Sequence, residues 1–370
     1  MEALNGLARA ILLSALSAAP VQAGEIEMTG IPLPAAPDWM SQLEIRRPDG
    51  GRILARAAEG IPAGELRKIL QDGFSASCEG RARTRRVTFH DIVLEADPDF
   101  LAAGQVPETS YARRMDVEIA SAGTCHAIAA LSAESFQAGD RLGTSLVAGR
   151  IDLRGDPASG VALSISDLDV QVAGSLPLLA AGSLDLTWQD AGEGAFTLGA
   201  RWSDASLEPR FLLGLEGAGG APVSGDGEIA MGCAADGFTL LLDVDMDNLT
   251  DTVADLGLVA PHCRPGKDSL LVHAAFATRD RGLLDLLKDA GGWTPTALGE
   301  GLAERVPALL AGVVKAQVAP VSGFIEASRA ADMAVEMTPA EPVGVSALAP
   351  LAILGPGAVA RKLGIDRNNE

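Results

Sequence analysis

Aromatic side chains are scarce in this sequence, which has one tyrosine and four tryptophans among 370 residues. Proteins that bind polysaccharides usually place tryptophan and tyrosine rings on their surface, so this class is disfavoured. Basic residues are also in the minority, since 29 Lys and Arg stand against 49 Asp and Glu and give a formal net charge of -20. Nucleic-acid binding requires clustered Lys and Arg that neutralise phosphates. We therefore expect no nucleic-acid partner and no attraction to anionic lipid headgroups.

Motifs that carry catalytic chemistry are also missing. The sequence has no Gly-x-Ser-x-Gly elbow to expose a nucleophilic serine. The glycine-rich stretch 216–221 lacks the lysine of a phosphate-binding loop, and no pair of carboxylates stands out as acid and base. We therefore expect that the protein is not an enzyme and that it has no catalytic residue and no cofactor. The alternative is a hydrolase with a scattered site, in which a histidine meets a carboxylate and a Ser or Thr, with His90 beside Asp91 as the candidate.

Metal ligands are few, because the chain has only four histidines. Two of them adjoin cysteines, in Cys125-His126 and His262-Cys263, but zinc sites space their ligands by a few residues. Residues 243–248 resemble the first half of an EF-hand loop. Asn248 and Ala254 then occupy the positions of the loop's glycine and closing glutamate. We expect no metal and interpret these aspartates as the polar positions of an alternating strand.

The four cysteines are Cys78, Cys125, Cys233 and Cys263. An even count in an exported protein indicates disulfides, and four cysteines allow three pairings. We favour Cys78–Cys125 with Cys233–Cys263, because each bridge then closes a loop within one half of the chain. Each would contribute about 2–4 kcal/mol by restricting the unfolded chain.

Long hydrophobic runs are absent after the first residues. Arg9, an apolar stretch over 10–19 and a Pro20 break before Ala23 are typical of a cleaved secretory signal peptide, residues 1–23. The stretch is too short to span a membrane, which needs roughly 20 apolar residues. We expect export to the periplasm of a Gram-negative bacterium and no transmembrane segment in the mature chain.

Much of the remaining chain alternates apolar and polar residues, which predicts half-buried strands. The expected strands cover residues 87–93, 115–119, 163–166, 183–188, 196–202, 237–246 and 332–337. Turn signals at 154–157, 190–194 and 224–227 separate several of them. Closely spaced strands without regular intervening helices favour an antiparallel meander.

Helical signals are fewer. Capping residues and apolar spacing predict helices over 62–71, 249–256, 280–289 and 295–327, the last kinked at Pro307. The predicted fold class is therefore α+β, mainly β: a curved antiparallel meander with amphipathic helices packed on its apolar face, after a cleaved signal peptide. We expect an N-terminal β-rich region over 24–135 and a sheet with late helices over 136–370. The alternative is one continuous domain.

A sheet face lined by aliphatic side chains suits either a core or the binding of acyl chains. The candidate lining comes from three of the expected strands: Leu184, Leu186, Trp188, Phe196, Leu198, Trp202, Phe238, Leu240 and Leu242. The simpler interpretation is that these residues form the core.

The segments 163–172, 182–188 and 211–217 resemble AsmA-like envelope proteins, which repeat short strands of the form Gly-Ser-Leu-x-Leu. The C-terminal run over 324–365 is similar to closing segments of uncharacterised exported proteins of Gram-negative bacteria. The resemblance implies an elongated curved β-sheet with an apolar interior, and a role in envelope maintenance or lipid handling. It implies no catalytic residue.

The preferred hypothesis is a periplasmic, non-enzymatic protein that binds or shields a lipid-like apolar ligand in the cell envelope. The alternative is a structural or adaptor protein of the envelope with a protein partner, which predicts a filled core and an exposed apolar patch.

Overall fold

The computed structural model describes residues 43–46, 52–72, 74–75, 78, 82–95, 109–139, 145–156, 160–171, 177–192, 194–208, 222–265, 268–283, 285 and 333–344. Strands make up 79% of these residues. The chain divides into two compact units, Met1–Gln189 (unit 1) and Asp190–Glu370 (unit 2), which we describe separately. The predicted signal peptide lies outside the described residues, and the expected regions 24–135 and 136–370 meet inside strand β5 of unit 1.

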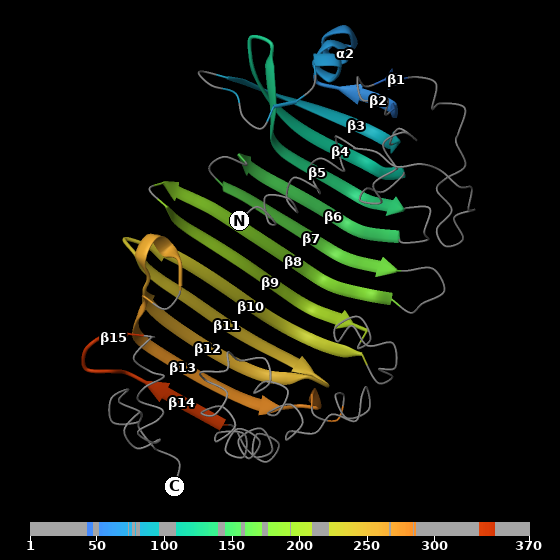
Figure 1. Cartoon of the computed structure of the whole chain (residues 1–370). Helices are drawn as coiled ribbons and strands as arrows, with labels where there is room; N and C mark the ends of the chain where they lie inside the picture. Colours follow the sequence, from blue (N-terminus) through green and yellow to red (C-terminus); the bar gives the residue numbers. More distant parts are fainter. Residues whose placement is uncertain are drawn as a thin grey trace, which may run out of the picture. The chain divides into compact units, whose positions relative to one another are not determined.

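Unit 1 is an antiparallel meander in which each strand pairs with the next one along the chain (Figure 1). Its strands are β1 (Leu43–Arg46), β2 (Arg52–Glu59), β3 (Arg83–Glu95), β4 (Thr109–Ala122), β5 (Cys125–Gly139), β6 (Ser145–Asp156), β7 (Gly160–Gln171) and β8 (Pro177–Gly192). Helix α2 (Ala63–Asp72) follows β2, where a helix was predicted over 62–71.

Unit 2 is also an antiparallel meander, with its strands paired in chain order. Its elements are β9 (Ala195–Leu207), β10 (Val223–Ala234), β11 (Gly237–Asp247), β12 (Thr250–Val259), the short 3-10 helix η2 (Pro261–Cys263), β13 (Leu270–Asp280), β14 (Met333–Met337) and β15 (Val343–Gly344). Strand β15 also pairs with β13. Among the described residues, no helix is long and apolar enough to cross a membrane.

The predicted α+β class is wrong, because the described residues are almost entirely antiparallel strand and no amphipathic helix among them packs on the sheet. The helix expected over 249–256 is instead part of β12. The apolar residues of that segment fit both a helical and a strand periodicity. As a strand, it places Ala254, Leu256 and Leu258 on the same face as the apolar residues of β11. Asn248 does not cap a helix; its φ of 61° turns the β11–β12 hairpin. The expected helix over 295–327 lies outside the described residues. Of the helix expected over 280–289, residue 280 ends β13, residues 283 and 285 are helical, and residues 284 and 286–289 lie outside the described residues.

The turn predicted over 224–227 is also wrong, since these residues belong to strand β10. The glycines of this segment allow neighbouring atoms to approach the backbone closely. A Cβ at Gly227 would lie 2.2 Å from the Trp202 ring, and one at Gly225, whose φ is 151°, would lie 2.0 Å from the Asp245 carbonyl oxygen. Glycine within a strand commonly marks such a contact.

Both predicted disulfides are confirmed. Cys78–Cys125 lies in unit 1 and Cys233–Cys263 in unit 2, with Cα–Cα distances of 5.8 Å and 5.7 Å. These separations fall within the usual range for disulfide bonds. Each bridge therefore ties a loop to strands of its own unit.

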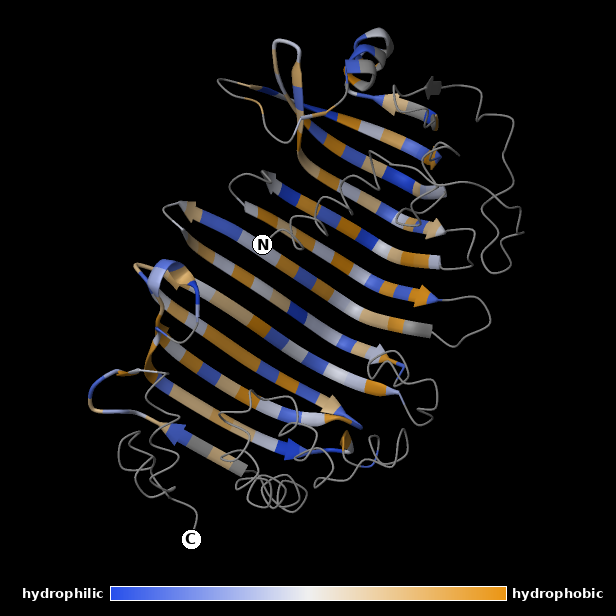
Figure 2. Ribbon diagram, in the orientation of Figure 1, coloured by the Kyte–Doolittle hydropathy of each residue, from blue (hydrophilic) through white to orange (hydrophobic). Residues whose placement is uncertain are grey.

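The core of unit 1 is one face of its sheet, where apolar side chains stand in register across the strands (Figure 2). One row crosses six strands: Val87, Val117, Leu131, Leu153, Leu163 and Leu186. The next row is Phe89, Met115, Ala133, Ile151, Ile165 and Leu184. From β3 to β7 every member of both rows is at most 7% exposed. This part of the face is therefore filled.

A crease crosses this face beside the second row. On each strand from β3 to β8, two consecutive residues separate that row from the next apolar side chain: 90–91, 113–114, 134–135, 149–150, 166–167 and 182–183. Asp91, Ser135 and Asp167 take positive φ values of 47°, 53° and 52° on alternate strands. Such a residue changes which face the following side chains occupy. Apolar side chains on both sides of the crease therefore reach the same face.

The opposite face of unit 1 is polar, with hydroxyls and carboxylates alternating in one row: Thr88, Asp116, Ser132, Asp152, Ser164 and Asp185. Arg86 Nη2 lies 2.9 Å from Asp116 Oδ2, and Thr88 and Arg114 also donate to this carboxylate. Burial would raise the pKa of Asp116, but the hydrogen bonds from Arg86, Thr88 and Arg114 outweigh it and lower the pKa to about 2. Cross-strand partners of this kind help to fix register.

Because its pKa is lowered on folding, Asp116 stabilises the protein above the ordinary carboxyl pKa and loses this effect as the pH falls towards 2. We expect Asp116→Asn to lower the free energy of unfolding by about 2 kcal/mol at pH 7, and by progressively less below pH 4. Denaturant titrations of both proteins across this range measure the difference. Glu118→Gln, an exposed carboxylate on the same strand, is the control. A loss that stayed constant down to pH 2 would contradict the ionic origin.

Candidate functional site

The candidate site is the apolar face of unit 2, where strands β9 to β14 bring apolar residues into register (Figure 2). One row is Leu198, Met231, Leu240, Leu256, Ala274 and Met337. The adjoining row, which we call the belt, is Ala200, Ile229, Leu242, Ala254 and Phe276. Alternation of side chains along each strand explains why one face collects these residues.

Packed clusters lie on either side of the belt. The larger one is built on buried residues near the Cys233–Cys263 bridge, including Phe238, Leu258 and Leu271, with Val343 of β15 against them. The smaller one is built on Val223 and Met246, against which Trp202 packs. Trp202 and Gly227 stand opposite each other, and the indole ring covers the glycine. These clusters supply the core of unit 2.

The belt belongs to neither cluster. Ala200, Ile229, Leu242 and Ala254 are only half-buried, and Phe276 is 37% exposed. The filled rows of unit 1 have the same residue types in the same alternating pattern, yet there they are buried from β3 to β7. The belt therefore leaves apolar surface in contact with water, which burial against a further apolar group would remove.

The nine predicted lining residues fall into two sets. Leu184, Leu186 and Trp188 lie on β8, on the apolar face of unit 1, and are half-buried. The other six share the apolar face of unit 2: Phe196, Leu198, Trp202, Phe238, Leu240 and Leu242. Within that set Phe238 is buried at 7% and Phe196 and Leu240 pack against the same cluster, whereas Leu242 belongs to the belt.

Sequence reasoning missed four members of the belt: Ala200, Ile229, Ala254 and Phe276. Strand β10 has low strand propensity because Gly225, Gly227 and Gly232 interrupt it, and the apolar spacing over 249–256, where β12 lies, predicts a helix. The signal that could have found them is alternation itself, because Ile229, Met231 and Cys233 recur every second residue.

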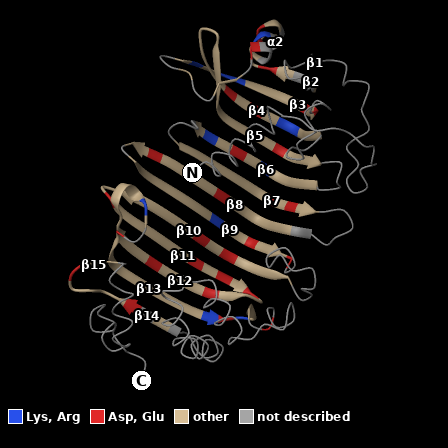
Figure 3. Ribbon diagram, in the orientation of Figure 1, with Lys and Arg blue, Asp and Glu red and all other residues tan. Residues whose placement is uncertain are grey.

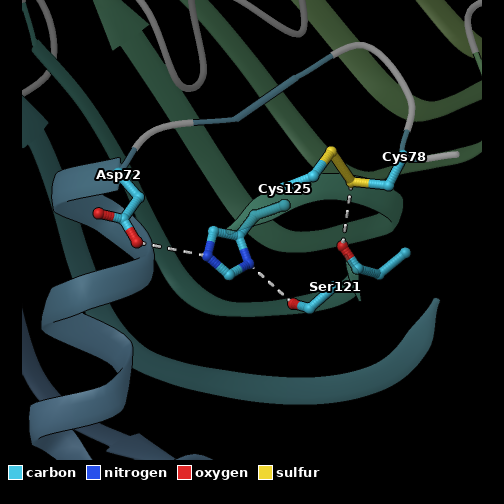
Figure 4. Close-up of a disulfide and its surroundings, with 6 residues drawn as sticks. Asp72, Cys78, Ser121 and Cys125 are labelled. Atoms are coloured by element: carbon cyan, nitrogen blue, oxygen red, sulfur yellow. Dashed lines mark hydrogen bonds and ion pairs between the residues drawn. A yellow bond between two sulfur atoms is a disulfide. The ribbon is translucent and has the colours of Figure 1, made fainter. Parts of the chain in front are cut away.

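A separate polar contact involves His126, which is 7% exposed at the start of β5 (Figure 4). The Ser121 hydroxyl lies 2.9 Å from Nδ1 of His126, and Asp72 Oδ2 of helix α2 lies 3.7 Å from Nε2. A histidine near a serine and a carboxylate is the arrangement that the hydrolase alternative requires, but it forms at His126 and not at His90. Both ring nitrogens of a buried imidazole gain a partner here, so the trio joins α2 to the β4–β5 hairpin.

The acidic segment 243–248 forms the end of β11 and its turn. Asp243, Asp245 and Asp247 are exposed on one face of the strand, as the alternating pattern predicted, and Arg281 pairs with the last two. Within the described ranges, no group of three or more His, Cys, Asp or Glu side chains is placed to hold a metal ion.

Comparison with protein-family models, curated proteins and solved structures finds no match to this chain. Function is therefore inferred from the residues of these faces alone.

Proposed function

We propose that this chain is a non-enzymatic periplasmic protein that binds a lipid-like apolar ligand in the cell envelope. The apolar face of unit 2 is the binding surface, with the belt at its centre. The observation that carries the proposal is that the belt is half-exposed, whereas the corresponding rows of unit 1 are buried from β3 to β7. An apolar ligand laid on the belt gains about 25 cal/mol for each Å² of apolar surface that leaves water.

The chemistry of the face favours acyl chains as ligands. The belt and its neighbouring row consist of aliphatic residues, methionine and one phenylalanine. The alanines at 200 and 254 stand beside larger side chains in the belt, which gives the surface relief along the row. No charged residue stands in either row, so a polar group placed there would lose hydration without a partner.

The periplasmic location is supported by the two disulfides, because such bonds persist in oxidising compartments. The acidic composition argues against recruitment by anionic headgroups. Binding would then depend on the apolar part of the ligand. The resemblance to AsmA-like proteins stays a prediction that points the same way.

The test is native mass spectrometry of the full chain purified from a periplasm, with lipid extraction of the same sample and titration with the fluorescent fatty acid cis-parinaric acid. We expect the wild type to retain lipid. Leu242→Asp should weaken binding at least about tenfold, because a ligand would desolvate the new carboxylate. Thr239→Asp places the same charge on the same strand but on the opposite, exposed face, and should bind as the wild type does.

The outcomes separate the two hypotheses. Lipid retained by a folded Leu242→Asp variant would contradict binding at the belt. A wild-type mass with two disulfides, no lipid and no response to cis-parinaric acid would favour the adaptor alternative. That alternative has its own support, since the face of unit 1 is filled and apolar side chains are exposed on β11, β12 and β13.

A further inference from the structure

The exposed large apolar side chains of the described residues are concentrated on three neighbouring strands. Six large apolar residues of the described part are more than a third exposed, and all six lie on β11, β12 or β13. Four of them stand on the face of unit 2 opposite the belt, which we call the outer face: Leu241 (39%), Val253 (42%), Val259 (38%) and Leu270 (38%).

Register shows how these four are arranged. Leu241 is opposite Asp255 and Val253 is opposite Asp243, so the two apolar side chains are diagonal neighbours across β11 and β12. Val259 and Leu270 are directly opposed on β12 and β13. Ala230 stands opposite Leu241, and Ala277 stands opposite Val253. Small side chains therefore extend a low apolar surface around the larger ones.

The charged residues of strands β10, β11 and β12 are all acidic (Figure 3), and the charges on the outer face are predominantly negative. The carboxylates are Asp226, Glu228, Asp243, Asp245, Asp247, Asp251, Asp255 and Glu336, and the arginines are Arg201, Arg279 and Arg281. Like charges stand directly opposite each other at Glu228 and Asp243, at Asp226 and Asp245, and at Asp245 and Asp251. Several of these carboxylates also have a basic partner: Arg201 Nη2 lies 2.7 Å from Glu228 Oε2, Arg281 pairs with Asp245 and Asp247, and Arg279 is opposite Asp251. Directly opposed like charges destabilise a sheet.

The polar face of unit 1 is built differently. There Arg86 is opposite Glu118, and Glu134 is flanked by Arg114 and Arg150 on its two neighbouring strands. That face matches opposite charges, and none of the exposed large apolar residues lies on it. The outer face of unit 2 also has opposed opposite charges, but eight carboxylates stand there against three arginines. It thus combines exposed apolar surface with an excess of negative charge.

We propose that the outer face of unit 2 docks a basic, amphipathic segment of a partner protein. Apolar side chains of the segment would contact Leu241, Val253, Val259 and Leu270, and its Lys and Arg side chains would relieve the repulsion among the carboxylates. The charge argues against the other occupants. An anionic lipid surface and a second copy of the same face would both add negative charge. This surface is independent of the belt, which faces the other way.

The probe is an amphipathic helical peptide of leucine and lysine, about 18 residues long, titrated into the full disulfide-bonded chain and followed by fluorescence anisotropy. A peptide with glutamate in place of lysine tests the charge requirement. We expect two double variants each to weaken binding of the lysine peptide by about tenfold. One is Leu241→Ser with Val253→Ser, and the other is Asp243→Asn with Asp251→Asn. The control is Glu118→Gln with Asp185→Asn, which removes the same charge from the polar face of unit 1.

Three results would overturn the proposal. The glutamate peptide could bind as well as the lysine peptide, or the control variant could weaken binding as much as the outer-face variants do. Alternatively, sedimentation could show a dimer of the chain that Leu241→Ser with Val253→Ser dissociates, which would make a second copy the occupant. Far-UV circular dichroism and intact disulfide mass establish that each variant is folded. Lipid retention in Leu242→Asp tests the belt separately, so the two proposals can fail independently.

Discussion

Replacing Cys78 and Cys125 by serine is expected to lower the free energy of unfolding by about 4 kcal/mol. The bridge closes a loop with a sequence separation of 47, and the entropy that this restriction removes from the unfolded chain amounts to about 4 kcal/mol at room temperature. Denaturant titration of the oxidised wild type and the double variant measures the loss.

The loss should be felt first at helix α2. The segment after this helix is held to β5 by the Ser75 N–H, which donates to the His126 carbonyl at 2.7 Å, and by Cys78 itself. Without the bridge, only non-covalent contacts such as the Asp72–His126 pair and the Ser75 hydrogen bond hold this segment to β5, so we expect faster amide exchange at Leu66 and Ser75. Serine at Cys233 and Cys263 opens a loop with a separation of 30 and should cost a similar free energy without changing exchange in α2. Equal exchange in the two variants would contradict this local role.

The strands could be predicted because alternation is a local signal. Both disulfides could be predicted because a small even number of cysteines allows few pairings. Alternation places Met115, Val117 and Ile119 on one face, and all three are buried as β4 residues. Pairing cysteines within each half of the chain gave the correct bridges. The helix expected over 249–256 failed because Leu249, Val253 and Leu256 also fit a helical face. The neighbouring strands β11 and β13 decided the outcome, and a single segment carries no information about its neighbours.

The crease of unit 1 was not predicted, although its signal is present. In β3 the alternation Val87, Phe89 resumes at Ile92 after His90 and Asp91, a step of three where two is expected. Taken alone, such a step looks like the end of a strand. It acquires meaning only when the same step occurs at matching register in six strands. The positive φ values of Asp91, Ser135 and Asp167 then mark the line on alternate strands.

Alternation could also predict which candidate residues share a face, but not which of them are buried. Leu153 of unit 1 and Leu242 of the belt both stand in apolar rows of antiparallel strands. Leu153 is 6% exposed and Leu242 is half-buried. The difference depends on what covers each face, which is a property of the whole fold. The same reasoning applies to Leu241, whose exposure on the outer face no local pattern reveals.

Alanine at Leu153 and alanine at Leu242 should therefore differ in their effects on stability and on ligand binding. Leu153→Ala leaves a cavity between Leu131 and Leu163, its neighbours in register, and is expected to cost about 3 kcal/mol of unfolding free energy. Leu242→Ala removes a side chain that is already partly hydrated and should cost about 1 kcal/mol. Thermal unfolding with and without cis-parinaric acid measures both the stability and the ligand effect.

A ligand that binds the folded state raises its stability in proportion to the logarithm of its concentration over Kd. Leu153→Ala should keep the stabilisation by ligand although the variant is less stable than the wild type, because residue 153 lies in the filled face of unit 1. Leu242→Ala should lose most of it although the protein is nearly as stable as the wild type. If the two variants instead lost stability equally and responded equally to the ligand, Leu242 would be a core residue. The belt would then be part of a filled core, as the adaptor alternative requires.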